Sequence, residues 1–156
     1  YIAGLLEHSS EMTLFTNQWV NSYKRLVSGY EAPVYKTWAK SGRSDLVRVP
    51  TYKPGKESAV RIEYRSPDPA CNPYLAFSVM LASGLEGIEN RYKLPNASDV
   101  DVSSLTEKER EKAGVGVLPK DLSHAIEEAE GSVLLRKALG NHVFEKFIEN
   151  KKIALW

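Results

Sequence analysis

Arg61, Glu63 and Arg65 alternate with apolar residues in the segment VRIEYR. Because successive side chains of a β-strand point to opposite faces, this alternation predicts a strand with one charged and one apolar face. The three charges would lie about 6.6 Å apart, since a strand rises about 3.3 Å per residue. Such a row could bind an anion, a metal ion and a second anion. The same alternation is also typical of a solvated strand face, and the pattern alone does not distinguish the two.

Two further arginines flank a second predicted strand. Arg43 lies in the tight turn 41–44, and Arg48 lies in the short strand 46–49 that Pro50 stops. A guanidinium presents a rigid fork of donors that matches the oxygens of a carboxylate or phosphate. Both arginines are therefore candidates for gripping an anion. The alternative is a pair of exposed arginines in surface ion pairs.

Glu31 is the carboxylate that turn-forming residues bracket most closely. Ser28-Gly29 precedes it and Ala32-Pro33 follows it. These dipeptides are turn or hinge signals, so the carboxylate could sit on a short flap. A surface carboxylate on a turn is the alternative interpretation.

The elements around these residues are predicted from local signals. The turn 66–69 contains two prolines and ends the charged strand. Asn72 then caps a helix with Pro73 at its first position. From 74 to 85 this helix is apolar nearly all round, which predicts burial in a large core.

The remainder of the chain is predicted mostly to form elements that pack the core. Residues 1–18 carry an apolar stripe typical of one helix, residues 17–38 are typical of an ordered loop, and 52–58 of a hairpin-like connection. Thr106 and Glu109 form a capping box for a short charged helix that Gly114 ends. Of the other predicted helices, one opens at Pro119, one starts at 131–132, and the last is capped by Asn141.

Composition indicates one soluble domain and excludes several classes of function. The chain has 156 residues, of which 42% are hydrophobic and 26% charged, and its net charge is +1. This balance gives no long-range field for nucleic acid or for an anionic membrane. The longest apolar run is too short to span a bilayer, and Cys71 alone cannot form an internal disulfide, so a cytoplasmic protein is expected. Three histidines and one cysteine make a zinc site of the usual ligands improbable.

Three long motifs together resemble the C-terminal part of the catalytic domain of type I glutamine synthetase. They are NSYKRLVSGYEAP (21–33), GRSDLVRVP (42–50) and RIEYRSPDPACNPYLAF (61–77). The resemblance implies an α+β fold over residues 1–156, with antiparallel active-site strands backed by helices and a helical C-terminal region. It also implies ATP-dependent joining of ammonia to L-glutamate through γ-glutamyl phosphate, in a homododecamer with two Mg²⁺ or Mn²⁺ ions per site.

The resemblance implies a role for each matching residue in binding glutamate and in catalysis. Arg25 and Arg65 would hold the glutamate carboxylate. Glu31 would be the flap residue that closes over the intermediate and helps to take a proton from ammonium. Arg43 would stabilise the phosphoryl group during transfer, and this chemistry depends on positioned positive charge.

The nucleotide and the metal are implied to bind the remaining residues. Arg48 would contact the ATP phosphates together with Arg43, and Arg61 would lie beside the nucleotide. Glu63 would be a metal ligand, and its carboxylate oxygens suit magnesium or manganese. The family's other metal-binding carboxylates and its N-terminal β-grasp domain are not represented in this chain, which has no initial Met. We therefore expect a segment truncated at both ends that is inactive by itself.

Three positions depart from the family pattern. Gly42 stands where Asn is usual, and Ser28 where Pro is common. Ser103 stands where the regulated subtype has a tyrosine that is adenylylated, with Tyr92 a weaker match, so that control is expected to be absent.

Three other functions compete with glutamine formation. A γ-glutamyl ligase for a larger amine, such as a polyamine, would share the arginines that hold glutamate. A non-catalytic structural or regulatory relative would be expected to lose the Arg and Glu set, which stands intact here. A plain anion-binding module would bind ATP or glutamate without metal.

Overall fold

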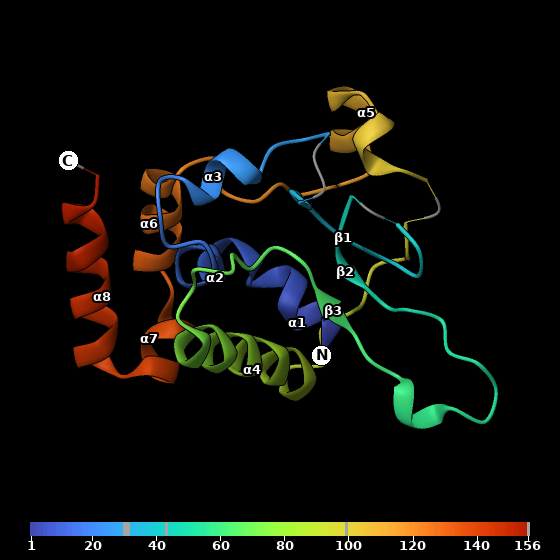
Figure 1. Cartoon of the computed structure of the whole chain (residues 1–156), viewed down its shortest axis with the longest axis horizontal. Coiled ribbons are helices and arrows are strands. Elements are labelled where there is room, and N and C mark those ends of the chain that lie inside the picture. The colour runs from blue at the N-terminus through green and yellow to red at the C-terminus, as the bar shows by residue number, and fades with distance from the viewer. Residues whose placement is uncertain (30–31, 43, 99, 156) are drawn as a thin grey trace.

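The computed structural model describes residues 1–29, 32–42, 44–98 and 100–155 (Figure 1). Within these ranges the chain is α+β, as predicted, with most helices on one side of a small sheet. The α-helices are α1 (Ile2–Glu7), α2 (Ser9–Thr16), α3 (Ser22–Arg25), α4 (Pro73–Glu89), α5 (Glu107–Lys112), α6 (Leu122–Glu130), α7 (Val133–Leu139) and α8 (Asn141–Ile153). The strands are β1 (Tyr35–Ala39), β2 (Asp45–Arg48) and β3 (Glu63–Tyr64), and the 3₁₀ turns are η1 (Glu57–Ala59) and η2 (Val102–Ser104).

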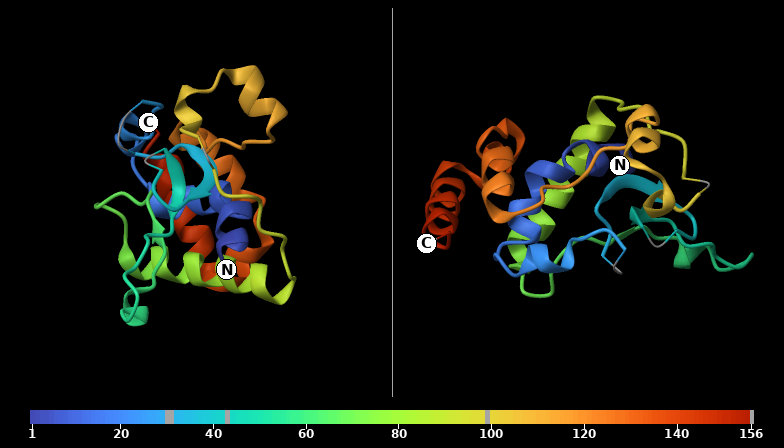
Figure 2. Two further views of the ribbon diagram at one scale, coloured as in Figure 1. Left: turned by 90° about the vertical axis from the view of Figure 1, so that its right-hand side faces the viewer. Right: turned by 90° about the horizontal axis from the view of Figure 1, so that it is seen from above.

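The strands form a sheet in the order β1-β2-β3 within the described ranges. β2 and β3 pair in antiparallel fashion, with Arg48 opposite Glu63. Residues 49–62 are therefore the connection of a hairpin; it contains the predicted connection 52–58 and is longer than predicted, and it projects from the body of the molecule (Figures 1 and 2). β1 and β2 pair in parallel, so the prediction of antiparallel strands holds for one of the two pairs.

The charged strand is shorter than its alternation predicts. Only Glu63 and Tyr64 are in strand conformation, and Val60 follows η1 with 56% of its surface exposed. The ladder ends because β2 stops before Pro50, which has no amide hydrogen to donate. Ile62 and Tyr64 nevertheless pack against the core, as expected for the apolar face.

The helix predicted after the charged strand is α4, and its capping is confirmed. Asn72 Oδ1 accepts hydrogen bonds from the amides of Tyr74 (3.0 Å) and Leu75 (3.4 Å), and Pro73 is the first helical residue. The prediction that this helix is buried all round is wrong in this structure. One face is buried against α1 and α7, and the opposite face is exposed to solvent.

The N-terminal segment forms two helices where its stripe predicts one. The break falls at His8, whose backbone leaves the helical region (φ −88°, ψ 8°) and whose ring nitrogen Nδ1 lies 3.0 Å from Glu11 Oε1. The predicted loop 17–38 contains α3 and most of β1. These elements are short, and their local sequence signal is correspondingly weak.

The C-terminal helices begin at some of the predicted signals, but Pro119 does not open α6, and Asn141 is the first residue of α8 and not its cap. The Thr106–Glu109 capping box opens α5, and Gly140 (φ 74°) separates α7 from α8. Asp121 caps α6, which therefore starts three residues after Pro119. Within the described residues, the helices all lack the length or the apolar character needed to cross a membrane.

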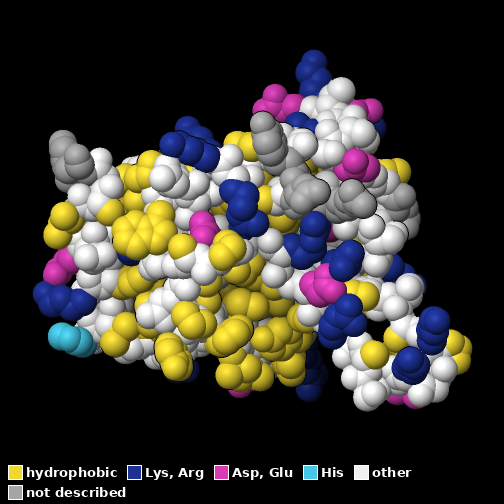
Figure 3. All heavy atoms as spheres, viewed as in Figure 1, with side chains coloured by type: hydrophobic (Ala, Val, Ile, Leu, Met, Phe, Trp, Pro, Cys, Tyr) yellow, Lys and Arg dark blue, Asp and Glu magenta, His cyan; other side chains and the backbone are white. Residues whose placement is uncertain are grey.

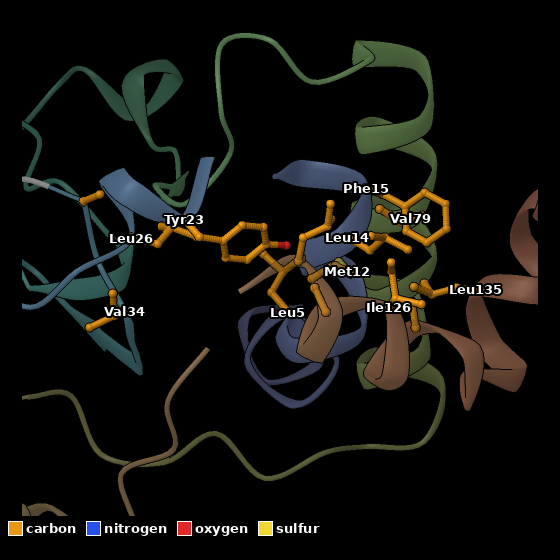
Figure 4. Close-up of a cluster of buried hydrophobic side chains, with 14 of the residues drawn as sticks. Leu5, Met12, Leu14, Phe15, Tyr23, Leu26, Val34, Val79, Ile126 and Leu135 are labelled. Carbon is orange, nitrogen blue, oxygen red and sulfur yellow. The ribbon is translucent and has the colours of Figure 1, made fainter. Parts of the chain in front are cut away.

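The largest core cluster joins the N-terminal helices to α4 and to the C-terminal helices (Figure 4). Side chains from these separate elements point toward one another in the close-up. The labelled members are Leu5, Met12, Leu14, Phe15, Tyr23, Leu26, Val34, Val79, Ile126 and Leu135. This core holds the helices together. Ile62 and Tyr64, beside the charged residues of the sheet, pack against it.

Candidate functional site

Glu63 lies between two guanidinium groups at the β2–β3 pair. Arg48 donates to Glu63 Oε2 from Nε (2.7 Å) and lies 2.6 Å from it through Nη2. Arg61 approaches Oε1 through Nε (3.3 Å) and Nη2 (3.2 Å). The register of β2 and β3 explains the first pair, because Arg48 and Glu63 are directly opposite. The residues predicted to bind phosphate and metal are therefore brought together.

The two arginines lower the pKa of the Glu63 carboxyl. Burial acts to raise the pKa of Glu63, but the hydrogen bond and charge of Arg48, followed by those of Arg61, outweigh it and hold this pKa below its ordinary value. About a quarter of the Glu63 side chain (27%) and more than half of that of Arg61 (58%) are exposed. An incoming ligand can therefore reach both charges.

Arg65 begins the segment that leaves β3, and Arg25 contacts the same segment. Arg65 Nη1 donates to the carbonyl oxygen of Asp45 (3.1 Å) on the neighbouring strand. Arg25, the last residue of α3, donates through Nη2 to the carbonyl oxygens of Ser66 and Pro67, the latter at 3.0 Å. The two arginines predicted to hold glutamate thus adjoin the same stretch of chain.

Glu31 and Arg43 lie outside the described residues, so the structure does not place these two predicted catalytic side chains. Residues that flank Glu31 are described. Gly29 has φ 86°, a left-handed conformation that favours glycine, and Ser28 Oγ lies 2.8 Å from the Tyr35 hydroxyl at the start of β1.

Asp45 is a buried carboxylate that the sequence reasoning missed. Its oxygen Oδ2 lies so close to Gly42 that a Cβ at position 42 would overlap it, and that Cβ would also lie 3.2 Å from the Cβ of Ala39. Gly42, which has no Cβ, therefore leaves room for this carboxylate.

Glu63 is suited to contribute one ligand to a divalent ion. Its carboxylate is ionised and accessible, and Mg²⁺ and Mn²⁺ prefer such oxygen donors. The described residues contain no group of three or more His, Cys, Asp or Glu side chains placed to hold a metal ion. These residues thus fit a metal site in part, with Glu63 as one ligand.

Comparison with known proteins identifies the family. The model of the family described as "Glutamine synthetase, catalytic domain" matches residues 1–155. The glutamine synthetase of Mycolicibacterium smegmatis is 53% identical over 152 residues, which cover 97% of this chain and 34% of that relative. The glutamine synthetase of Methanosarcina mazei is 50% identical over 153 residues, which cover 98% of this chain and 34% of that relative. The chain thus spans about a third of the length of these curated relatives. It belongs to the glutamine synthetase catalytic-domain family.

Proposed function

We propose that this chain carries the C-terminal share of the active site of a type I glutamine synthetase. The full-length enzyme would join ammonia to L-glutamate, with ATP supplying the phosphoryl group of a γ-glutamyl phosphate intermediate. The observation that carries this proposal is the Arg48–Glu63–Arg61 cluster, in a chain about half identical to named glutamine synthetases.

The cluster is suited to phosphoryl transfer because its charges are already positioned. Arg48 would contact the ATP phosphates, Arg61 would lie beside the nucleotide, and Arg43 would stabilise the phosphoryl group in transfer. The guanidinium of Arg48, which now pairs with Glu63, would turn to phosphate oxygens of the same geometry, and Arg61 would turn to the nucleotide. Glu63, released from them, would be one ligand of a Mg²⁺ or Mn²⁺ ion, of which the complete site would hold two. When bound, these ions neutralise charge on the phosphate oxygens.

The glutamate substrate would lie on the other side of the cluster. Arg25 and Arg65 would pair with its carboxylate, and both already contact the backbone around β2, β3 and the following turn. Glu31, on the flap between Gly29 and Ala32, would take a proton from ammonium as the nucleophile forms. A negative group suits that step because it both attracts the cation and accepts its proton.

The chain by itself would be inactive, and the complete enzyme would be a cytoplasmic homododecamer. One carboxylate cannot hold two divalent ions, so the remaining ligands must come from parts of the enzyme that this chain does not match. Ser103 lies in η2, where its hydroxyl donates to Asp101 Oδ1 (2.7 Å). A serine there in place of tyrosine would leave the enzyme without control by adenylylation.

The test is formation of γ-glutamyl hydroxamate from glutamate, hydroxylamine and Mg-ATP. It compares this chain with a chimaera in which the chain replaces the matching 152-residue segment of the Mycolicibacterium smegmatis relative. We expect product from the chimaera alone. Glu63→Gln in the chimaera should lower activity about a hundredfold or more, as loss of one positioned charge does elsewhere.

The control is Glu127→Gln, which removes an exposed carboxylate on α6 and should leave activity unchanged. Both variants should keep the melting temperature of the parent chimaera. Product formation by the short chain, or full activity of the Glu63→Gln chimaera, would contradict the proposal.

A further inference from the structure

His8 lies at the centre of a chain of hydrogen bonds that joins three helical regions. Its Nδ1 lies 3.0 Å from Glu11 Oε1, and its Nε2 lies 3.3 Å from the Tyr92 hydroxyl. The other oxygen of Glu11 bonds with the Ser132 hydroxyl, whose Oγ accepts from the amide of Leu135 in α7 (3.1 Å). These side chains connect the break between α1 and α2 to the start of α7 and to the segment that follows α4. We name His8, Glu11, Tyr92 and Ser132 the His8 network.

The direction of each hydrogen bond in the His8 network follows from the Glu11 carboxylate. Burial raises the pKa of Glu11, but the hydrogen bonds to His8 and Ser132 and nearby positive charge outweigh it, so the carboxylate is ionised near neutral pH. An ionised carboxylate only accepts, so His8 donates through Nδ1. In the neutral ring Nε2 is then an acceptor, and the Tyr92 hydroxyl donates to it. Protonation of His8 reverses this last bond, because Nε2 becomes a donor and the Tyr92 oxygen an acceptor.

The segment that Tyr92 joins to the network begins with a strained turn. Arg91 has φ 53°, a left-handed conformation that residues with a Cβ rarely adopt. The amide of Tyr92 donates to the carbonyl oxygen of Gly87 (2.9 Å), which closes the turn at the end of α4. Glycine is usual at this place in a helix C-terminus. An arginine keeps such a conformation only where other contacts hold the chain, and the contact between Tyr92 and His8 is one of them.

The charged groups near the Tyr92 end of the network are mostly carboxylates. Burial raises the pKa of Tyr92, and the charges of Glu86, Glu7 and Glu11 raise it further. Lys36 is a positive group beside them, and its Nζ donates to the carbonyl oxygen of Glu7 (3.3 Å). The charged residues of α4 lie in its last turn, whereas hydrophobic side chains gather over α4 in Figure 3. Three carboxylates and the Lys36 ammonium group therefore surround this end of the network.

We propose that the His8 network responds to pH and holds the segment after α4 more firmly when His8 is protonated. Histidine is the side chain whose charge ordinarily changes between about pH 5 and pH 8. A hydrogen bond from a charged donor is roughly twice as strong as a neutral one, so the bond from Nε2 to the Tyr92 oxygen is the stronger arrangement. The Tyr92 proton then turns to water, which reaches it from a hollow of about 560 Å³ that Tyr92 lines together with Glu7, Lys36 and Lys93.

The segment held by the His8 network continues to the sheet. The Trp38 indole donates to the carbonyl oxygen of Pro95 (2.8 Å), and the amide of Ser98 donates to the carbonyl oxygen of Trp38 (2.8 Å). Trp38 belongs to β1, which pairs with the strand that carries Arg48. Residues 92–98 therefore run from the network to the strands of the candidate site. The inference does not depend on the proposed reaction, because every contact in it lies within this chain.

The test measures how fast trypsin cuts after Lys93, inside the held segment, in the parent chain and in His8→Gln. Glutamine places an amide donor near the position of Nε2 but does not titrate. Dividing the parent rate by the His8→Gln rate removes the pH dependence of the protease. We expect this ratio to be at least about threefold lower at pH 6 than at pH 8, because cleavage follows the population of the opened segment.

A Tyr92→Phe background provides the matched control. Phenylalanine keeps the ring and removes the hydroxyl, so the ratio measured in this background should be equal at the two pH values. Cleavage after Lys112, at the end of α5, should also give a ratio that does not change with pH. Melting temperatures at both pH values verify that each variant is folded.

A second measurement needs no variant of His8. Nitrogen-15 NMR of the His8 ring in the parent chain should show the neutral tautomer that carries its proton on Nδ1 at pH 8. A proton on Nε2 instead would contradict the bond directions and overturn the inference.

A cleavage ratio that is equal at pH 6 and pH 8 would also overturn it. So would a ratio that falls as strongly in the Tyr92→Phe background, because His8 would then act through another contact.

Discussion

At the scale of single residues, the ion pairs around Glu63 are partly exposed, and such pairs contribute only about 0–1 kcal/mol to stability. The fold would therefore lose little if Arg48 and Arg61 left Glu63 for a ligand, as the proposed function requires. The same two arginines lower the pKa of the Glu63 carboxylate, and the ionised form is the one that the proposed metal role needs.

The alternation of charges predicted that Arg61, Glu63 and Arg65 would form a row on one strand face; of these, Glu63 is in strand conformation, and Arg61 and Glu63 form an ion pair. It did not predict that Arg48 would complete the cluster. That contact depends on the register of two strands joined by a long connection, which local sequence does not encode. The sequence pattern also did not predict that Asp45 is buried, because an acidic residue usually lies at the surface.

Gly42 and Asp45 provide a prediction about stability. Gly42→Ala should lower the free energy of unfolding by about 1–3 kcal/mol, because the new Cβ overlaps the Asp45 carboxylate. In an Asp45→Ala background the same change should have a much smaller effect. Urea unfolding of the four proteins of this double-mutant cycle measures the coupling.

The control for this cycle is Ser41→Ala, at an exposed neighbouring position. It should be close to neutral in both backgrounds. Effects of Gly42→Ala that are equal with and without Asp45 would show that the glycine is needed for another reason.

Glu11 provides a prediction about pH. Burial acts to raise its pKa, but hydrogen bonds from His8 and Ser132, and then the charges of His8 and Lys36, outweigh it, so the pKa in the folded chain lies below the ordinary value of 4.5. A depressed pKa stabilises the fold above the pKa of the unfolded chain. That stabilisation is lost as the pH falls from about 4.5 through the lower folded value.

Chemical unfolding between pH 6 and pH 3 tests this prediction. Glu11→Gln should lower stability at pH 6 and should make its decline toward pH 3 shallower than in the parent chain. Glu127→Gln, at an exposed position, should leave the slope unchanged. If the stability of the parent chain and of Glu11→Gln fell equally steeply between pH 6 and pH 3, the lowered pKa of Glu11 would be refuted.

At the scale of elements, capping signals predicted helix boundaries well because they act locally. Asn72, Thr106 and Ser132 each accept a backbone hydrogen bond at the start of a helix. The break at His8 and the short β3 were not predicted, because the sequence pattern continues through both. The α4 pattern predicted a helix buried in a core, but one face of α4 is exposed in this structure.

The close contact between α1 and α4 gives a prediction in which the direction of the stability change, up or down, is the test. In an exposed helix, replacing glycine by alanine is stabilising by up to about 1 kcal/mol. At Gly4 a Cβ would overlap the carbonyl oxygen of Ser83 and lie 2.9 Å from the amide nitrogen of Gly87. Gly4→Ala should therefore be destabilising by about 1–3 kcal/mol, as measured by thermal or urea unfolding.

Gly131→Ala is the matched control for this crossing. Gly131 ends α6 with an ordinary φ of −73°, and the nearest atom to its added Cβ would be 3.8 Å away. It should be neutral or slightly stabilising. A Gly4→Ala chain as stable as Gly131→Ala would show that the two helices separate easily.

At the scale of the whole molecule, the chain folds around its own core. The α+β class followed from the motif resemblance, and the structure and the family match confirm it. The proposal that the site is shared with further parts of an enzyme follows from the small number of candidate metal ligands. Among the described residues Glu63 is the carboxylate proposed to bind the metal, and no group of three or more candidate ligands is present.

Manganese binding tests this division of the site. The isolated chain should bind Mn²⁺ with a Kd weaker than about 1 mM, because single carboxylates do not displace the hydration shell of the ion effectively. The chimaera with the Mycolicibacterium smegmatis relative should bind it more tightly, and Glu63→Gln should weaken that binding at least about tenfold. Paramagnetic resonance of free Mn²⁺ measures both values directly, without requiring activity. Tight binding by the isolated chain would place a complete metal site within these 156 residues and would overturn the divided site.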